Sequence, residues 1–275
     1  MKTIYGAILI LTATLFSPAV NALPVPTGWS CTGDCGSLSA DGVVTTSPNG
    51  GTYQYVTTIG TTGIVGVGAL PTGLLGTETN GSVLDTSAFS AADGDLLRFN
   101  FNYVTSDGAT FADYVWAALI DSANNSTILF TARTIAAGDV VPAFGTSLAP
   151  GVTLTPATTG ILGGLITGDI GPNWSPLGAT TCYDAGCGYT GWIQSDYIVP
   201  VAGTYTLRFG ATNWDDEAWD SGLAIDGVLI AGTPVGDDVE DPAVPEPSTA
   251  VLLGLGTFAL AFRVRRQRSS FGSAQ

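Results

Sequence analysis

The sequence predicts an all-β fold, an antiparallel jelly roll or β-sandwich, with an N-terminal signal peptide and a short C-terminal transmembrane helix. Three observations predict the β fold. Several segments alternate apolar and polar residues with a period of two, turn residues separate these segments, and no helical period of useful length appears between the two ends. Short strands joined by Gly- and Asp-containing turns are typical of sandwiches and jelly rolls.

The clearest strand patterns are at 97–103 and 205–212, where every second residue is apolar. Such alternation places one set of side chains in the core and the other in solvent. The segments 114–120 and 223–230 are apolar on both parities except for Asp226, which predicts strands buried on both faces. Further strands are expected at 52–58, 126–134 and 197–200, turns at 48–51, 80–81, 92–94, 106–108, 137–139 and 202–203, a glycine-rich loop or irregular strands at 60–81, and an insertion between strands at 148–181.

The first 22 residues have the pattern of a secretory signal peptide. Lys2 precedes an apolar run from Ile4 to Phe16, and Val20-Asn21-Ala22 supplies small residues for cleavage after Ala22. The alternative is an N-terminal membrane anchor. The run is short for a span of about 20 apolar residues, and Pro18 interrupts it, which favours cleavage and export.

The C-terminal end combines Val244-Pro245-Glu246-Pro247, an uncharged stretch at 248–262, and an arginine cluster made of Arg263, Arg265, Arg266 and Arg268. The segment 244–264 is barely long enough to cross a bilayer, and its arginines would stay cytoplasmic, so a plain membrane helix is one interpretation. The combination resembles the PEP-CTERM sorting signal. This resemblance implies a Gram-negative bacterium, transient anchoring in the inner membrane, cleavage by a membrane-embedded exosortase, and delivery to the cell surface or exopolysaccharide matrix.

These two ends define the expected domains. They are a signal peptide at 1–22, a β-sandwich ectodomain at 23–231, an acidic Pro-rich stalk at 232–243, the sorting and anchor segment at 244–268, and a tail at 269–275. The ectodomain has a length that fits one β unit. The stalk has few large apolar residues, as in flexible linkers.

The region between the two ends is strongly acidic. It holds all of the chain's 23 acidic residues except Glu246, and its basic residues are Arg98, Arg133 and Arg208. Nucleic-acid binding needs Lys or Arg contacts to phosphate, so this composition argues against a nucleic-acid partner. The charge also repels anionic lipid and attracts cations, or it serves only to keep the protein soluble and monomeric.

The four cysteines, Cys31, Cys35, Cys182 and Cys187, all lie in the ectodomain. An even count in an exported chain predicts disulfides. The spacing suggests local pairs Cys31–Cys35 and Cys182–Cys187, and pairing between the two ends of the domain is an alternative. A tetrathiolate zinc site is a further alternative, which an oxidising compartment and the irregular spacing disfavour.

Two ectodomain segments add a second resemblance. The run 99–108 with Phe111-Ala112-Asp113-Tyr114, and the run 203–214 leading into 220–228, resemble the lectin-like jelly-roll ectodomains that precede PEP-CTERM tails and are called choice-of-anchor domains. The resemblance implies a jelly-roll fold and is only weakly informative about function.

The residue types limit the chemistry. There is no histidine, which excludes Ser-His-Asp and Cys-His catalysis and histidine-based metal sites. No phosphate-binding glycine loop is visible. A carboxylate pair, as in glycoside hydrolases, is the remaining catalytic option, and with this many acids chance pairs are unavoidable. We therefore expect no catalytic residue.

An acidic cluster from Asn213 to Asp220 is the most distinctive local feature. Calcium takes six to eight oxygen ligands from carboxylates, amides and carbonyls, which this segment offers. Asp226 in an apolar strand would need a cation or an arginine as partner. The predicted calcium ligands are a subset of Asp107, Asp113, Asp215, Asp216, Asp220 and Asp226; the alternative is that these acids are solvated turn residues.

The tryptophans Trp174, Trp192, Trp214 and Trp219 are either core residues or platforms for sugar stacking, with Trp214 and Trp219 the stacking candidates because they flank the acids. The leading hypothesis is a non-enzymatic surface or matrix protein that associates with exopolysaccharide. The second hypothesis is a secreted polysaccharide hydrolase using paired carboxylates.

Overall fold

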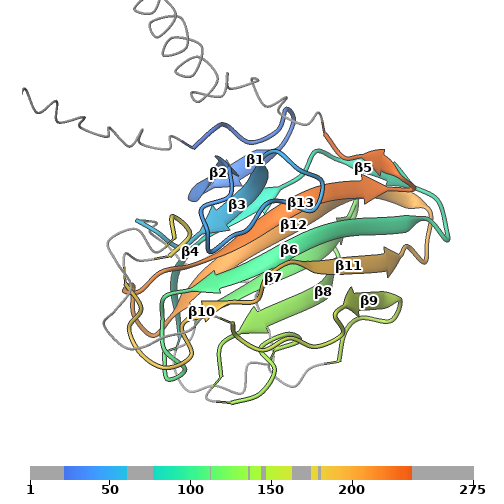
Figure 1. Cartoon of the computed structure of the whole chain (residues 1–275). Helices are drawn as coiled ribbons and strands as arrows, with labels where there is room; N and C mark the ends of the chain where they lie inside the picture. The colour runs from blue at the N-terminus through green and yellow to red at the C-terminus, as the bar shows by residue number, and fades with distance from the viewer. Residues whose placement is uncertain are drawn as a thin grey trace, which may run out of the picture. The chain divides into compact units, whose positions relative to one another are not determined.

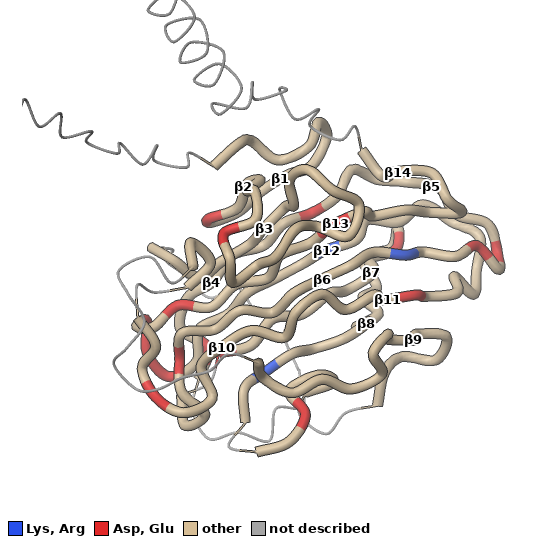
Figure 2. The backbone as a smooth tube through the Cα atoms, in the orientation of Figure 1, with Lys and Arg blue, Asp and Glu red and all other residues tan. Residues whose placement is uncertain are grey.

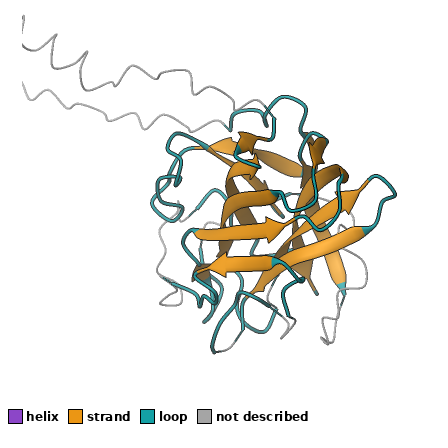
Figure 3. Ribbon diagram, turned by 90° about the vertical axis from the view of Figure 1, so that its right-hand side faces the viewer, coloured by secondary structure: helices purple, strands orange, loops and turns teal. Residues whose placement is uncertain are grey.

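The computed structural model describes residues 22–60, 77–111, 113–135, 137–143, 147–162, 175–178 and 181–236. It confirms the all-β fold: two antiparallel sheets pack face to face, and the described residues form strands, turns and loops without a helix (Figures 1 and 3). No helix among them is long and apolar enough to span a bilayer. The signal peptide and the sorting segment lie outside the described residues, so both remain predictions of the sequence at this stage.

Each strand belongs to one of the two sheets. The first sheet has the order β1-β4-β12-β7-β8, with β5 paired to β12. Its strands are β1 (Ser30–Thr32), β4 (Glu78–Asp85), β5 (Phe89–Ala91), β7 (Tyr114–Asp121), β8 (Ser126–Arg133) and β12 (Gly203–Trp214). The second sheet has the order β2-β3-β13-β6-β11-β9, with β10 paired to β6 and β14 to β13. Its strands are β2 (Asp34–Leu38), β3 (Tyr53–Thr57), β6 (Leu96–Thr105), β9 (Val152–Thr155), β10 (Gly188–Tyr189), β11 (Ile193–Ile198), β13 (Ser221–Ile230) and β14 (Thr233–Pro234).

The core between the sheets is built from the apolar parity of the predicted strands. Phe99 and Phe101 of β6 are fully buried and meet aromatic rings from the opposite sheet. Phe99 lies edge-on to Phe209 of β12 with ring centroids 5.3 Å apart, and Phe101 stacks on Phe130 of β8 at 3.8 Å. Each fully buried phenylalanine contributes about 1.5–3 kcal/mol to the free energy of unfolding, so these rings hold the two layers together.

Strand β7 is buried on both faces, as its apolar sequence predicts. Val115, Ala117 and Leu119 face the main core, whereas Tyr114, Trp116 and Ala118 form a second cluster with Trp214. Trp116 lies across Gly210 of the neighbouring strand, where an added Cβ would meet its indole ring at 2.2 Å. A glycine at this position therefore lets the indole lie against the sheet.

Three sequence predictions about local structure differ from what the structure shows. Asn80-Gly81 is not a turn but lies inside β4, because Gly81 pairs with Thr212 of β12. The strand expected at 197–200 is β11, which begins at Ile193 and ends at Ile198. The expected insertion at 148–181 contains strand β9, which pairs with β11 and extends the second sheet. In each case, pairing with a strand distant in sequence outweighs the local signal.

The β unit continues past the boundary expected at residue 231. Thr233 and Pro234 of β14 pair with the end of β13, and the Trp29 indole nitrogen donates a hydrogen bond to the Val235 carbonyl at 3.0 Å. The first part of the predicted stalk is therefore packed against the sandwich, because Val235 is buried.

The cysteines stand as two local pairs. Cys31 and Cys35 have Cα atoms 5.9 Å apart, and Cys182 and Cys187 have Cα atoms 5.7 Å apart. Both separations suit a disulfide. The structure thus favours the local connectivity over pairing between the ends of the domain.

Candidate functional site

One end of the sandwich, here called the loop end, gathers most of the residues that the sequence predicted to be functional. It comprises residues 105–114, 181–188 and 213–221, where β6 and β12 end and β7 and β13 begin. Figure 2 shows acidic residues crowding at this end, beside the labels of β4 and β10. Loops at the end of a rigid sandwich are a common place for binding residues.

Asp113 is a deeply buried acid of the loop end, with 1% of its surface exposed. Its Oδ1 accepts a hydrogen bond from the Trp214 backbone N–H at 3.0 Å, and its Oδ2 lies 2.8 Å from the Ser221 hydroxyl. Burial raises the pKa of Asp113 well above its ordinary value, and the neighbouring Asp107 raises it further. Burial therefore favours the protonated, neutral form of Asp113, which joins β12 to β13.

Asp107 and Asn213 carry polar atoms that have no hydrogen-bond partner. Asp107 Oδ1 accepts from the Gly108 N–H at 2.7 Å, but its buried Oδ2 has no partner, and burial raises its pKa to about 8. Asn213 is fully buried; its amide oxygen has no hydrogen-bond partner, whereas its side chain interacts with Asp220 and lowers the pKa of that carboxyl. Buried polar atoms without hydrogen-bond partners cost free energy of folding. The loop end therefore contains polar atoms that a bound ligand or ion could stabilise.

The six predicted calcium ligands do not all come together. Asp220 lies near Asp113 and accepts a hydrogen bond from the Thr58 hydroxyl at 3.0 Å. Asp215 accepts from the Thr77 N–H, and Asp216 is exposed. Asp226 lies along β13 away from this end, where Asn49 donates its backbone N–H at 3.0 Å and its amide at 2.8 Å. Within the described residues, no three acids are placed to hold one metal ion.

Three aromatic side chains from three different loops meet on the surface of the loop end. We call Phe111, Tyr183 and Trp219 the aromatic trio. The Tyr183 ring lies 6.2 Å from Phe111 and 5.4 Å from Trp219, measured between ring centroids. Tyr183 is 44% exposed, and the other two are half-buried. The trio therefore forms a partly exposed aromatic surface in which Tyr183 lies beside both other rings.

The loop that carries Tyr183 is held from several sides. It lies inside the Cys182–Cys187 pair, and the Tyr183 N–H donates to the Ser106 carbonyl at 2.8 Å. The Thr134 hydroxyl donates to the Gly186 carbonyl at 3.0 Å. Trp219 has a φ of 63°, which is unusual for a bulky residue and is retained where surrounding structure enforces it. These constraints fix the positions of two of the rings.

The other tryptophans have different environments. Trp214, predicted to be able to stack on sugar, is only 6% exposed and packs against Tyr114 at 6.3 Å, so it belongs to the cluster behind β7. Trp192 donates its indole N–H to the Thr45 carbonyl and lies edge-on to Tyr53. Trp174 lies outside the described residues. Phe111 and Tyr183 were missed in the sequence, although a tyrosine inside a short cysteine loop is a detectable signal.

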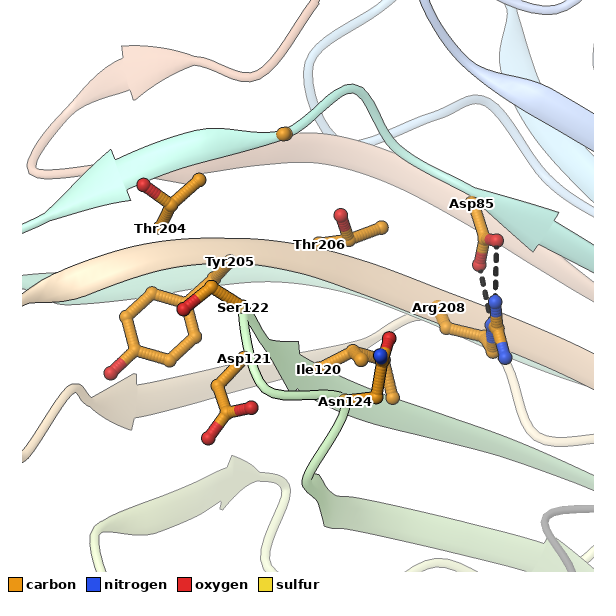
Figure 4. Close-up of a pocket in the computed structure, with 10 residues that line it drawn as sticks. Asp85, Ile120, Asp121, Ser122, Asn124, Thr204, Tyr205, Thr206 and Arg208 are labelled. Carbon is orange, nitrogen blue, oxygen red and sulfur yellow. Dashed lines mark hydrogen bonds and ion pairs between the residues drawn. The ribbon is translucent and has the colours of Figure 1, made fainter.

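A pocket lies on the outer face of the first sheet, at the opposite end of β12 from the loop end (Figure 4). This outer pocket has a volume of about 280 Å³. Its lining residues come from β4, the β4–β5 loop, β7, the β7–β8 turn and β12, and they are Asp85, Ala88, Ile120, Asp121, Ser122, Asn124, Thr204, Tyr205, Thr206 and Arg208. The Arg208 guanidinium forms two hydrogen bonds to the Asp85 carboxylate, at 2.6 and 2.7 Å.

The raised pKa of Asp107 predicts that the protein is more stable at acidic than at alkaline pH. The folded-state pKa is about 8 against an ordinary 3.8, so between these values the folded protein holds a proton that the unfolded chain has lost. This contribution is full below about pH 4 and is lost as the pH rises through about 8. The raised pKa of Asp113 changes the stability with pH in the same direction. The charge of the exposed Asp216 raises the pKa of Asp107, whereas Arg133 lowers it.

Melting temperatures measured across this pH range with a chelator present should therefore fall toward high pH, and Asp107→Asn should flatten the profile. A wild-type melting temperature that rises toward pH 9 would contradict the prediction.

Calcium binding at the loop end stays a prediction, supported by the oxygen atoms of Asp107 and Asn213 that lack partners. Repeating the scans with excess calcium at matched ionic strength tests it, since identical curves would leave these groups without a cation.

Comparisons with known proteins identify the C-terminal segment. No curated protein matches the chain. One similar solved structure is the K1 cleaved adhesin domain of Lys-gingipain (Kgp) from Porphyromonas gingivalis W83, at 15% identity over 75% of this chain and 91% of that one, with a TM-score of 0.35. Another is an exo-beta-agarase, at 10% identity over 78% of this chain and 25% of that one, with a TM-score of 0.30. At these values neither neighbour bears on function. Residues 243–266 match the PEP-CTERM protein-sorting motif, and the chain is therefore an exported protein that carries this surface-sorting signal.

Proposed function

We propose that the ectodomain is a non-enzymatic binding protein of the cell surface or extracellular matrix, and that it associates with exopolysaccharide through the aromatic trio. The sorting motif supports the location outside the cell. The observation that carries the binding role is the partly exposed cluster of Phe111, Tyr183 and Trp219 on three loops. Aromatic rings gathered on a surface mark interaction sites, and their flat apolar faces match the C–H faces of sugar rings.

The surroundings of the trio favour a ligand rich in hydroxyl groups. Asp184, Asp216 and Glu217 lie in the same loops and are exposed. Ionised carboxylates accept hydrogen bonds from hydroxyl donors, and charge-assisted bonds of this kind are strong. The same charges repel uronate or sulfate groups, so the proposal favours neutral or amino sugars.

The hydrolase hypothesis has weaker support. Glycoside hydrolases place two carboxyl groups on either side of the scissile bond, where substrate reaches both. Asp107 and Asp113, two acids of the loop end that influence each other electrostatically, are each 1% exposed, so a polysaccharide chain has no access to them. We therefore keep the non-enzymatic proposal and measure sugar release in the binding experiment itself.

The test is affinity electrophoresis of the mature protein in gels containing the producer's exopolysaccharide. Tyr183→Ala with Trp219→Gly should weaken retardation at least tenfold, which is about 1.4 kcal/mol of binding free energy. Glycine suits position 219 because it tolerates the positive φ. Val201→Ala, an exposed apolar residue outside the loop end, is the matched control and should change nothing. Equal retardation of the double variant and wild type would refute the trio as the binding surface, and sugar release would favour the hydrolase.

A further inference from the structure

The outer pocket has the features of a second ligand site. Figure 4 shows side chains of β4, β7, β12 and the β7–β8 turn around the pocket. Among the described residues, the side chains of Ser122, Asn124, Thr204 and Thr206 have no hydrogen-bond partner, although all four line the pocket. They offer hydroxyl and amide groups that act as both donors and acceptors. A ligand in this pocket would therefore meet several free hydrogen-bonding groups close together.

The frame that carries these groups is fixed by its own hydrogen bonds. Asp121 accepts three bonds across the β7–β8 turn, from the Ala123 N–H, the Asn125 N–H and the Asn125 amide, each at 2.8 Å. This turn places Asn124 in the left-handed region with φ 64°. The Tyr205 hydroxyl donates to the Val201 carbonyl at 2.6 Å. A site whose walls are already ordered loses less entropy when a ligand binds.

The charges of the pocket select against ionic ligands. Arg208 is its only basic residue, and the bidentate contact with Asp85 neutralises it. Hydrogen bonds from Asn125 lower the pKa of Asp121, so this carboxylate is ionised and would repel an anion. A cation would meet Asp121 and one aromatic ring, that of Tyr205, whereas ammonium groups are usually held by several aromatic faces. A neutral ligand fits best.

The size and polarity of the pocket narrow the ligand further. Its volume of about 280 Å³ is just below the usual lower bound of about 300 Å³ for small-molecule sites, so it admits one ring-sized unit. Ile120, Ala88 and the Tyr205 ring supply apolar surface beside the hydroxyl and amide groups. We propose that the outer pocket binds a single neutral sugar unit, as a free monosaccharide or as one residue of a polysaccharide.

The position of the pocket has a consequence for polymer binding. This consequence rests on the proposed function, whereas sugar binding in the pocket does not. Strand β12 has 12 residues and links the pocket at its start to the loop end at its finish. At about 3.3 Å per residue, its two ends lie roughly 35 Å apart. Two sugar sites so far apart would let one protein engage two polysaccharide segments and would raise the avidity for a polymer.

The test uses the mature protein and saturation-transfer NMR with glucose, galactose, mannose and glucuronate. We expect at least one neutral sugar to bind and glucuronate to bind at least fivefold more weakly. Thr206→Val with Asn124→Gly removes one hydroxyl and one amide while keeping a β-branched strand residue and a positive φ, and should reduce binding at least tenfold. Thr153→Val, the same change on an exposed position of β9, should leave binding unchanged.

Two outcomes would overturn the inference. One is the absence of saturation transfer to wild-type protein from all three neutral sugars at millimolar concentration. The other is equal binding by wild type and the pocket variant when both have the same melting temperature. Failure of this inference is distinguishable from failure of the proposed function, because the trio variant is tested on polymer and the pocket variant on free monosaccharide.

Discussion

Replacing Pro245-Glu246-Pro247 by three alanines should abolish the mature form and leave an uncut protein in the membrane fraction. These residues lie inside the segment that matches the PEP-CTERM sorting motif, residues 243–266. The motif is the recognition signal for exosortase processing, and the apolar stretch and arginines behind it would still hold the uncut chain at the membrane. The expected effect is all-or-none, since the change removes the recognition element itself.

The matched control is Glu240-Asp241-Pro242, which has similar composition and lies just before the motif. Replacing these three residues by alanine should leave processing intact. Intact-mass measurement of the membrane and released fractions reads out both variants. Release of the Pro245-Glu246-Pro247 variant with the wild-type mature C-terminus would show that the triplet is dispensable, and a full-length C-terminus on released wild-type protein would contradict processing altogether.

Replacing Asp113 by alanine should lower the free energy of unfolding by about 3 kcal/mol, because it leaves the Trp214 N–H buried without its acceptor and removes the contact to Ser221. Asp113→Asn should cost less than about 1 kcal/mol. The pKa of Asp113 is raised by burial, so its side chain is expected to be neutral. Asparagine is also neutral, keeps an acceptor for Trp214, and donates to the Ser221 hydroxyl, which can turn its own hydrogen to Thr105 at 2.7 Å.

Urea unfolding of the three proteins at neutral pH measures these differences. Asp93→Ala, at an exposed turn, is the control for removing an acid and should stay within about 0.5 kcal/mol of wild type. If Asp113→Asn destabilised the protein as much as Asp113→Ala, the carboxylate would have to be ionised in the folded state. Its negative charge would then need a partner such as the nearby Arg133 or a bound cation.

The fold class and much of the core are predictable from the residue pattern alone. Alternation in β6 and β12 correctly named Leu97, Phe99, Phe101, Leu207 and Phe209 as core residues, because the side-chain period of a strand is a local property of the backbone. The double-sided burial of β7 followed from its unbroken apolar run for the same reason. The sorting segment could also be recognised from the sequence, because a motif that acts as a linear peptide does not depend on tertiary structure.

Features that depend on which strands pair could be seen only in the folded protein. Asn80-Gly81 has a turn sequence, yet it is extended in β4 because β12 supplies its hydrogen bonds. Asp226 finds Asn49 as its partner across a separation of 177 residues, which no local pattern encodes. Phe111, Tyr183 and Trp219 meet only because β6, β10 and β13 lie side by side in the second sheet, so their loops open at the same end. Contacts of this kind follow from topology, and topology is a property of the whole folded chain.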